Sequence, residues 1–493
     1  MKRILSLVLT LALALSLAAF VPAFADGELE HVTLKIIFPG DKKAATDEVW
    51  DAIAEKYADQ LNCDFEVQCI PLDDYSQKLL VMAGAGESWD LNFDSNWTGY
   101  YNMKAQEAYM DIAELLPVYA PHLYETYQAN GALAAATDNE GRVTALPWTM
   151  SMNNRTFFQW RGDLITKAGL DVKSDDINTT EDVLELCRKL KAAYPDKYIL
   201  ENVDLGVFLM KYDLFAIDNG LVIDLNDPEC KVMFVEDTEA YKERAEMAKT
   251  MQDEGIIWGD VLTDKRDHND LINEGMLITK WGTHEFSNQN RAWVEEDAYW
   301  DFNDLYTDHK YANRTPLANA MCIPETSENP ERVLMFMDLL ETDQELYDMV
   351  HYGILGKTYE LTEDGEAVFP EGMNGSNSNY MEWIGRWGLW KPQFMRPDFS
   401  YGPGFWAEEA AYAASNPNNV INPLDGFSLN MDAINIEVAE RNQIHGDAEK
   451  LLDVGLVDDV DAAIAKLQED QKAAGRDKVL EEVQRQIDEY LGK

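Results

Sequence analysis

The sequence predicts an α/β protein with two doubly wound lobes and additional helices at its C-terminus. Near the N-terminus, short β runs alternate with amphipathic helices, which is typical of a largely parallel sheet. The chain has 493 residues, too many for one ordinary hydrophobic core. From residue 459 onward, apolar side chains recur at helical spacing. These observations give the fold class before any motif is considered.

Residues 1–25 are expected to be a secretory signal peptide. Positive charge at Lys2 and Arg3 precedes an apolar run over 4–20, and Ala23-Phe24-Ala25 forms a small-x-small cleavage site. Asp26 would be the first residue of the mature chain. No later stretch approaches the roughly 20 apolar residues of a membrane-spanning helix. We therefore expect a secreted, soluble protein in the periplasm or at the cell surface.

The charge balance restricts the possible partners. The sequence contains 41 Lys and Arg residues against 90 Asp and Glu residues, a formal net charge of −49. Such a surface repels phosphate backbones and anionic membranes, so nucleic-acid binding is disfavoured. The hydrophobic content of 46% excludes a wholly disordered chain.

The five cysteines predict neither a disulfide framework nor a metal site, because their number is odd and no metal-ligand spacing is present. Cys63 and Cys69 bracket one predicted strand, which would hold them roughly 20 Å apart, so they should not pair. A lipid anchor would need a cysteine at the cleavage site, and Cys63 is the first one in the chain. We expect no lipobox and no cofactor.

The first lobe follows from the alternating pattern over 31–93. Predicted strands at 32–38, 65–69 and 89–93 enclose helices at 49–61 and 73–85. Three strands with two crossovers make half of a doubly wound sheet. In such sheets, ligands bind beyond the carboxyl ends of the strands.

A second α/β region follows the extended segment 143–148, in which Pro147 keeps Leu146 out of helical geometry. We expect helices at 161–169 and 180–194, and strands at 231–235 and 275–281. Helices at 459–467 and 478–491 should pack their apolar stripe on the main body. The expected domains are lobe 1 from 26–146 plus about 284–330, lobe 2 from about 147–283 plus 331–425, and a helical C-terminal domain from 426–493.

Several segments resemble the extracellular solute-binding proteins of ABC importers, in the broad group that includes maltodextrin receptors. The segments are Ile36-Ile37-Phe38-Pro39-Gly40, Tyr75-Ser76-Gln77-Lys78-Leu79, Gly84-Ala85-Gly86-Glu87-Ser88-Trp89-Asp90-Leu91, Ala145-Leu146-Pro147, Arg161-Gly162-Asp163-Leu164, Ala168-Gly169-Leu170 and Gly275-Met276. A narrower likeness, to a subgroup with a helical C-terminal domain of unknown function (DUF3502), lies in Asn329-Pro330-Glu331-Arg332-Val333-Leu334, Tyr352-Gly353-Ile354-Leu355-Gly356-Lys357 and the tail from Gly426-Phe427-Ser428 onward.

The resemblance implies a periplasmic-binding-protein-like fold, in which two α/β lobes joined by several crossing segments close on a ligand like a hinge. It also implies a small solute, for the group mostly a sugar or oligosaccharide, and an importer permease as the partner. We expect a monomer that binds its ligand in the cleft between the lobes.

Carbohydrate recognition requires aromatic faces against the apolar faces of sugar rings, with planar polar groups around them. One candidate group lies in or after the third strand and another follows the crossing segment. The residues are Trp89, Asp94, Asn96 and Trp97 in the first group, and Trp148, Asn153 and Arg155 in the second. Alternatively, Trp89 belongs to the core and Tyr100 packs on the next helix.

Two further groups of candidates come later in the chain. They are Trp281, His284 and Glu285, and then Trp383, Trp387 and Arg396, with Trp390 and Arg386 nearby. The resemblance places an aromatic residue such as Trp281 over the bound ligand. If their segment is helical, Trp383 and Trp387 share one face.

The alternative function is a secreted glycoside hydrolase or another glycan-active enzyme. Such an enzyme needs two carboxylates at ~5–9.5 Å across the scissile bond, and Asp94 with Glu285 is a conceivable pair. No zinc-protease motif, phosphate loop or nucleophile elbow supports catalysis. A binding protein that signals to a membrane sensor is a third possibility. We expect a solute-binding protein and no enzyme.

Overall fold

The computed structural model forms two compact units, each built from separate stretches of sequence. Unit 1 consists of Met1–Trp148, Asn319–Tyr359 and Phe369–Lys391, and unit 2 of Thr149–Ala318, Glu360–Val368 and Pro392–Lys493. The structure describes residues 29–138, 140–150, 156–217, 220–266, 268–282, 298–312, 315–374, 377–381, 386–398, 411–412, 415–424, 427, 429–431 and 433–493.

Unit 1 contains a mixed sheet whose described strands run in the order β2-β1-β3-β12-β4. β1 pairs in parallel with β2 and β3, and β12 pairs antiparallel with β3 and β4. Buried apolar side chains such as Leu34 and Ile36 on β1 hold the sheet in the core. The parallel half confirms the expected strand–helix alternation. The strands are β1 (Val32–Pro39), β2 (Cys63–Ile70), β3 (Leu91–Asp94), β4 (Leu146–Pro147) and β12 (Ala320–Cys322).

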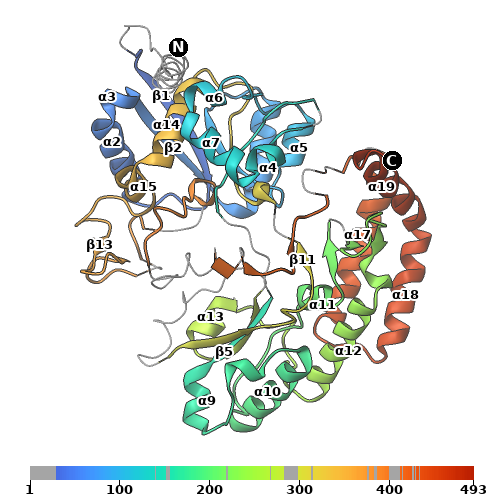
Figure 1. Ribbon diagram of the computed structural model, residues 1–493. Helices are drawn as coiled ribbons and strands as arrows, with labels where there is room; N and C mark the ends of the chain where they lie inside the picture. The colour runs from blue at the N-terminus through green and yellow to red at the C-terminus, as the bar shows by residue number, and fades with distance from the viewer. Residues whose placement is uncertain are drawn as a thin grey trace, which may run out of the picture. The chain divides into compact units, whose positions relative to one another are not determined.

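Helices from two distant stretches of the sequence cover this sheet. Figure 1 shows the gold helix α14 (Pro330–Thr342) beside the blue strands β1 and β2, although α14 begins 260 residues after the end of β2 at Ile70. The helices of unit 1 are α2 (Thr46–Lys56), α3 (Ala58–Leu61), α4 (Leu72–Gly84), α5 (Tyr100–Ala105), α6 (Leu116–Tyr119), α7 (Pro121–Asn130), α8 (Ala132–Ala136), α14 (Pro330–Thr342), α15 (Gln344–His351) and the 3-10 turn η4 (Trp387–Leu389).

The lobe boundaries expected from sequence need correction at two places. Residues from 331 onward were assigned to lobe 2, but α14 contacts α6 and α7, and α15 contacts α2, all in unit 1. The physical reason is the apolar face of α14, on which Val333, Phe336 and Met337 are fully buried. The sequence predicts residues 284–330 in lobe 1, and residues 319–330 do lie in unit 1, but the strand β10 (Trp300–Asp304) lies in unit 2 and pairs with β5 (Phe157–Arg161).

Unit 2 has a three-stranded sheet in the order β10-β5-β9, in which β9 spans Thr279–Gly282 and both pairs are antiparallel. Parallel contacts in the described part of unit 2 include the isolated bridges Tyr198–Leu277 and Leu200–Ile257. The expected helix at 180–194 is present as α10 (Thr180–Ala193), and a capping box between Thr179 and Asp182 begins it. The sheet of unit 2 is therefore less parallel than the strand–helix alternation predicts.

The elements described in unit 2 besides this sheet are short, except for α10, α12 and the C-terminal helices. They are α9 (Gly162–Ala168), η1 (Ser174–Asp176), α10 (Thr180–Ala193), α11 (Leu205–Lys211), β6 (Leu214–Ala216), β7 (Leu221–Asp224), β8 (Met233–Phe234), η2 (Val235–Asp237), α12 (Glu239–Asp253), α13 (His268–Asn273), β11 (Tyr311–Ala312), η3 (Pro316–Ala318), β13 (Glu360–Leu361), β14 (Ala367–Val368), β15 (Asn419–Val420), α17 (Asn435–Leu452), α18 (Val460–Ala473) and α19 (Arg476–Tyr490).

The C-terminal helices α17, α18 and α19 pack on α12 and on the small sheet β6-β7-β8 (Figure 1). Val479, Val483 and Ile487 of α19 are fully buried and join the cluster that contains Ile223 and Phe234 of the sheet. The expected packing of the 478–491 apolar stripe on the main body is therefore confirmed. The sequence reasoning missed α17, whose inward face carries a buried arginine.

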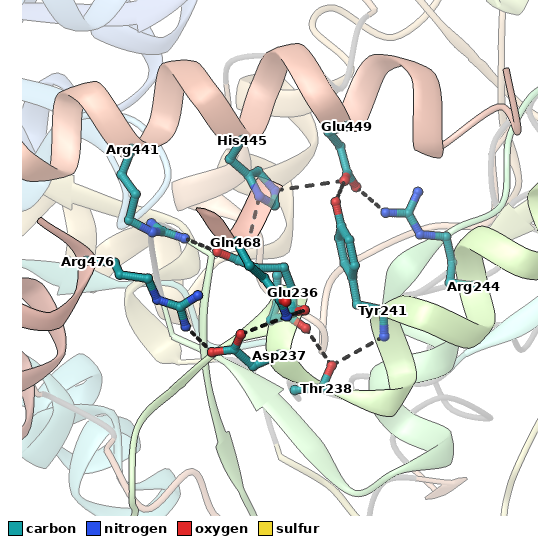
Figure 2. A network of polar contacts seen from close by, with 11 residues as sticks. Glu236, Asp237, Thr238, Tyr241, Arg244, Arg441, His445, Glu449, Gln468 and Arg476 are labelled. Carbon is teal, nitrogen blue, oxygen red and sulfur yellow. Dashed lines mark hydrogen bonds and ion pairs between the residues drawn. The ribbon is translucent and has the colours of Figure 1, made fainter. Parts of the chain in front are cut away.

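A network of charged side chains lies between these helices and the rest of unit 2 (Figure 2). Arg441 of α17 donates to Glu236 of η2 over 3.1 Å, and both side chains are fully buried. Arg244 of α12 donates to Glu449 over 2.5 Å and to Asp453 over 2.7 Å. The helices are thus joined to unit 2 by ion pairs as well as by apolar contacts.

Two further sequence predictions can be compared with the described residues. The five cysteines lie within the described residues, and none of them forms a disulfide there. Within the described part of the chain, no helix combines the length and the apolar composition required to cross a membrane.

Candidate functional site

Four tryptophans lie at the carboxyl-terminal edge of the unit 1 sheet. β1 and β3 run in parallel, and β12 is antiparallel to both β3 and β4. β3 and β4 therefore run in the same direction, and their carboxyl ends lie at the same edge of the sheet. Trp97 follows β3 and Trp148 follows β4. The turn η4 contacts both β3 and β12 and brings in the other two. We call Trp97, Trp148, Trp387 and Trp390 the tryptophan edge.

Trp97 and Trp387 contact each other edge to face. Their ring centroids are 5.6 Å apart with an interplanar angle of 64°, and both rings also contact the buried Phe93 of β3. Trp97 is 48% exposed, an unusual state for a large apolar side chain. One indole is therefore held in place by packing while much of its surface remains open to a ligand.

Trp148 and Trp390 form the second pair, stacked with centroids 5.9 Å apart and ring planes 26° from parallel. The backbone amide of Trp148 donates to the carbonyl of Asn319 over 3.0 Å, so this residue continues the edge of the sheet. The indole Nε1 of Trp148 is buried and has no hydrogen-bond partner within the described residues. The same holds for the Nε1 atoms of Trp50, Trp258 and Trp300, so this feature does not single out Trp148 as a ligand contact.

Gly388 allows η4 to lie close to the sheet. A Cβ atom at this position would be 2.8 Å from the carbonyl oxygen of Ala320, too close for any side chain. Ala320 pairs with Asp94 across β12 and β3. This close approach places Trp387 and Trp390 beside the end of β3.

The basic side chains in the same segment point into unit 1. Lys391 is fully buried and its Nζ lies 2.8 Å from Glu341 Oε2. Arg386 is buried, lies over the ring of Tyr380 at 4.7 Å, and donates to the Tyr380 carbonyl over 3.3 Å. The segment therefore presents indole rings at the edge while its cations have partners in the interior.

Asp94 is another of the predicted ligand contacts, and it is buried. Its carboxylate is 1% exposed at the end of β3, and Ser95, Thr98, Gly99 and Tyr109 all donate hydrogen bonds to it. Burial raises the pKa of Asp94 above its ordinary value, although these donors act in the opposite direction. The carboxylate accepts hydrogen bonds from four internal donors, and its predicted contact with a ligand stays a prediction.

Trp89 also belongs to the core and not to the ligand-facing edge. It precedes β3 at the amino end of the strand, is 2% exposed, and its Nε1 donates to Asn92 over 2.9 Å. The alternative reading of Trp89 as a core residue is the correct one. Tyr100 is buried too, with its hydroxyl 2.7 Å from Thr144 Oγ1. Asn96, by contrast, is exposed in the loop after β3.

Trp281 lies on β9 in unit 2. Its ring contacts Phe158 edge to face at 4.7 Å, and its Nε1 donates to the carbonyl of Asn202 over 2.8 Å. Trp281 is only partly buried, so one part of the indole remains accessible. Arg396 is half-buried, with Nη1 3.5 Å from the carbonyl of Gly365. These two candidates lie in unit 2, whereas the tryptophan edge lies in unit 1.

Several predicted site residues lie outside the described part of the chain, so their roles stay predictions. They are Asn153, Arg155, His284, Glu285 and Trp383. Trp387 begins a 3-10 turn after the non-helical Arg386, and the shared helical face proposed for Trp383 and Trp387 therefore has no support from the described residues.

Sequence reasoning missed Tyr109 and Thr98, which bind the Asp94 carboxylate. Thr98-Gly99 after an aspartate is a turn signal that could have indicated local hydrogen bonding. Nothing in the sequence around Tyr109 indicates its contact with Asp94, because the contact depends on the packing of the segment that follows α5.

The α/β units and the aromatic edge beyond the strand ends define a ligand-binding receptor of the solute-binding class. Comparison with known proteins agrees. The family model described as bacterial extracellular solute-binding protein matches residues 52–355, and the model described as domain of unknown function (DUF3502) matches residues 423–492. The chain therefore belongs to the bacterial extracellular solute-binding proteins, and the resemblance stated from sequence is confirmed.

Individual relatives show the same relationship. The chain is 25% identical over 470 residues to a carbohydrate ABC transporter substrate-binding protein of Streptococcus pneumoniae serotype 4, covering 93% of this chain and 91% of that protein. The crystal structure of the N-glycan transport solute binding protein NgtS from Streptococcus pneumoniae is similar with a TM-score of 0.78 at 20% identity, covering 94% of this chain and 99% of that chain. Its complex with Man1GlcNAc is similar with a TM-score of 0.70 at 22% identity, covering 94% and 100%. These likenesses confirm the predicted fold class.

Proposed function

We propose that this protein is the substrate-binding component of an ABC importer and that it binds an oligosaccharide at the tryptophan edge. The observation that carries the proposal is the exposed Trp97 held against Trp387 at the end of β3. Indole faces suit the apolar faces of sugar rings, and Asn96 beside Trp97 offers both a donor and an acceptor to hydroxyls. The carbohydrate ligands named for the relatives support the same class of ligand.

The charges around the edge favour an uncharged glycan. Arg386 and Lys391 have partners in the interior of unit 1, and Asp94 is enclosed by donors. The net charge of −49 disfavours polyanionic ligands over the whole surface. The proposed ligand contacts also include Trp148, Trp281 of unit 2, and five residues outside the described part of the chain, namely Asn153, Arg155, His284, Glu285 and Trp383.

We further propose that the protein acts outside the cytoplasmic membrane as a monomer, delivers its ligand to a permease, and has no catalytic activity. The two compact units would serve as the lobes of the receptor. Asp94 supports the absence of catalysis, because a carboxylate enclosed by four donors is poorly suited to attack a glycosidic bond. A light-scattering measurement of mass and an assay for new reducing ends test the monomer and the hydrolase alternative.

Isothermal titration of the mature protein tests the main proposal. The panel would contain neutral mannose and N-acetylglucosamine oligosaccharides, fructo-oligosaccharides, an oligouronate and a peptide. We expect a neutral oligosaccharide to bind and the oligouronate to bind at least tenfold more weakly. Binding of a peptide or an amine with no response to any sugar would contradict the carbohydrate assignment.

Trp97→Ala tests the site itself. Losing the exposed indole that is proposed to stack on a sugar ring should weaken binding of the oligosaccharide about tenfold, which corresponds to ~1.4 kcal/mol. Tyr212→Ala is the matched control, because it removes another partly exposed aromatic ring (36%) from the end of α11 in unit 2. Equal affinities for Trp97→Ala and the wild type would remove the tryptophan edge from the proposed site.

A further inference from the structure

The loop between β3 and α5 has a defined shape with two outward side chains. It runs over residues 95–99, and only Asn96 and Trp97 are exposed. Ser95 is fully buried, and its Oγ lies 2.8 Å from Thr98 Oγ1. The loop thus presents one amide and one indole while its other polar groups bond internally.

Asp94 fixes both ends of this loop through one oxygen. Its Oδ1 accepts hydrogen bonds from the amide of Ser95 over 2.8 Å, from Thr98 Oγ1 over 2.6 Å, and from the amide of Gly99 over 3.0 Å. Hydrogen bonds to a carboxylate are stronger than those between neutral groups. Three bonds that converge on a single buried oxygen leave the loop little freedom to change its shape.

Tyr109 holds the carboxylate from the other side. Its hydroxyl donates to Asp94 Oδ2 and accepts a hydrogen bond from Asn92 Nδ2 over 3.1 Å. Its ring stacks on Tyr100, the first residue of α5, with centroids 5.9 Å apart. Tyr109 itself is held by a β-bridge to Pro324. A packed core residue therefore holds the carboxylate from the side opposite to the loop.

We propose that Asp94, oriented by Tyr109, is a positioning residue that sets the conformation in which Asn96 and Trp97 meet the ligand. This inference deepens the proposed function and rests on it for the identity of the ligand. A loop that already has its bound shape loses less conformational freedom on binding, and so binds more tightly. The affinity would then depend on two buried side chains that do not touch the ligand.

Two conservative variants test the proposal. Tyr109→Phe removes the hydroxyl bonded to Oδ2 and leaves the three loop bonds to Oδ1. Asp94→Asn keeps the shape of the side chain and removes its charge. Tyr57→Phe is the matched control, because it removes a tyrosine hydroxyl that donates to Asp343 over 3.1 Å in the same unit, away from the loop.

Two readouts separate positioning from general stability and from direct contact. The first is the dissociation constant for the oligosaccharide selected by the panel. The second is the fluorine NMR resonance of Trp97 in ligand-free protein grown with 5-fluorotryptophan, assigned by its loss in Trp97→Phe. We expect Tyr109→Phe and Asp94→Asn to weaken binding about three- to tenfold and to shift or broaden the Trp97 resonance, and Tyr57→Phe to change neither.

Three outcomes would overturn the proposal. In one, the Trp97 resonance is unchanged in both variants while Asp94→Asn still weakens binding, which would make Asp94 a direct ligand contact. In another, Tyr57→Phe weakens binding as much as Tyr109→Phe, which would indicate a general loss of stability. In the third, neither affinity nor resonance changes. If no sugar binds the wild type, the proposed function fails, and the ligand-free Trp97 resonance still decides the positioning role.

Discussion

Replacing Arg441 by methionine should strongly destabilise unit 2, because it leaves a buried carboxylate without its ion partner. Arg441 and Glu236 are both fully buried, and their charged groups are 3.1 Å apart. The guanidinium also lies over the ring of Phe234 at 3.7 Å. Methionine fills much of the same volume, so the lost charge dominates the effect. Breaking a buried pair on one side typically costs about 3–5 kcal/mol.

His445 is another basic residue close to Glu236 in the described part of unit 2, with its Nδ1 3.8 Å from Oε2 (Figure 2). That distance is too long for a good hydrogen bond, so the histidine would compensate only in part. We therefore expect a loss at the lower end of this range. The double variant Glu236→Gln with Arg441→Met should recover most of it, because no buried charge is then left unpaired.

Urea unfolding followed by circular dichroism, together with scanning calorimetry, measures this effect. At a few degrees for each kcal/mol, the transition of unit 2 should fall on the order of 10 °C. The matched control is Lys478→Met, which removes a surface ion pair with Glu437 that joins α19 to α17 at 2.7 Å and should change stability much less, because water screens the pair. If Arg441→Met and Lys478→Met have equal effects, the reasoning from burial is wrong.

Two other perturbations give sharp expectations. Gly455→Ala should lower the free energy of unfolding by more than ~1 kcal/mol, because Gly455 has φ +70° and a Cβ would lie 2.2 Å from the Ala248 carbonyl oxygen. Gly446→Ala in α17 is the matched control, because a Cβ there meets nothing within 4 Å. It should raise the free energy of unfolding by about 0.5–1 kcal/mol. Equal unfolding midpoints for the two variants would contradict this. Burial, with Arg386 and Lys391 nearby, lowers the pKa of His351 to about 3, so the unfolded chain binds a proton that the folded chain does not. The free energy of unfolding should therefore be at its full value above pH 6.5 and fall as the pH drops, by about 2 kcal/mol at pH 5. Urea titrations at pH 5 and at a pH above 6.5 measure this difference, and His351→Gln should abolish it.

Much of unit 1 was predictable because its signals are local. The alternating run over 32–38 and the helical spacing over 73–85 each depend on a few neighbouring residues, and the structure contains β1 and α4 at these places. The motifs also sufficed for the family, because their order along the chain carries the likeness. The candidate Trp97 was found from its position after a strand, where parallel sheets present their ligands.

The sequence by itself determined much of the secondary-structure pattern, the family and the aromatic character of the candidate site, because periodicity and motif order are properties of the chain. Only the tertiary structure decided that α14 packs in unit 1, that β10 pairs with β5, and that the Asp94 carboxylate meets Tyr109. These facts depend on contacts between segments far apart in the sequence. An apolar face or a carboxylate shows locally that it needs a partner, but the folded chain alone determines which partner it meets.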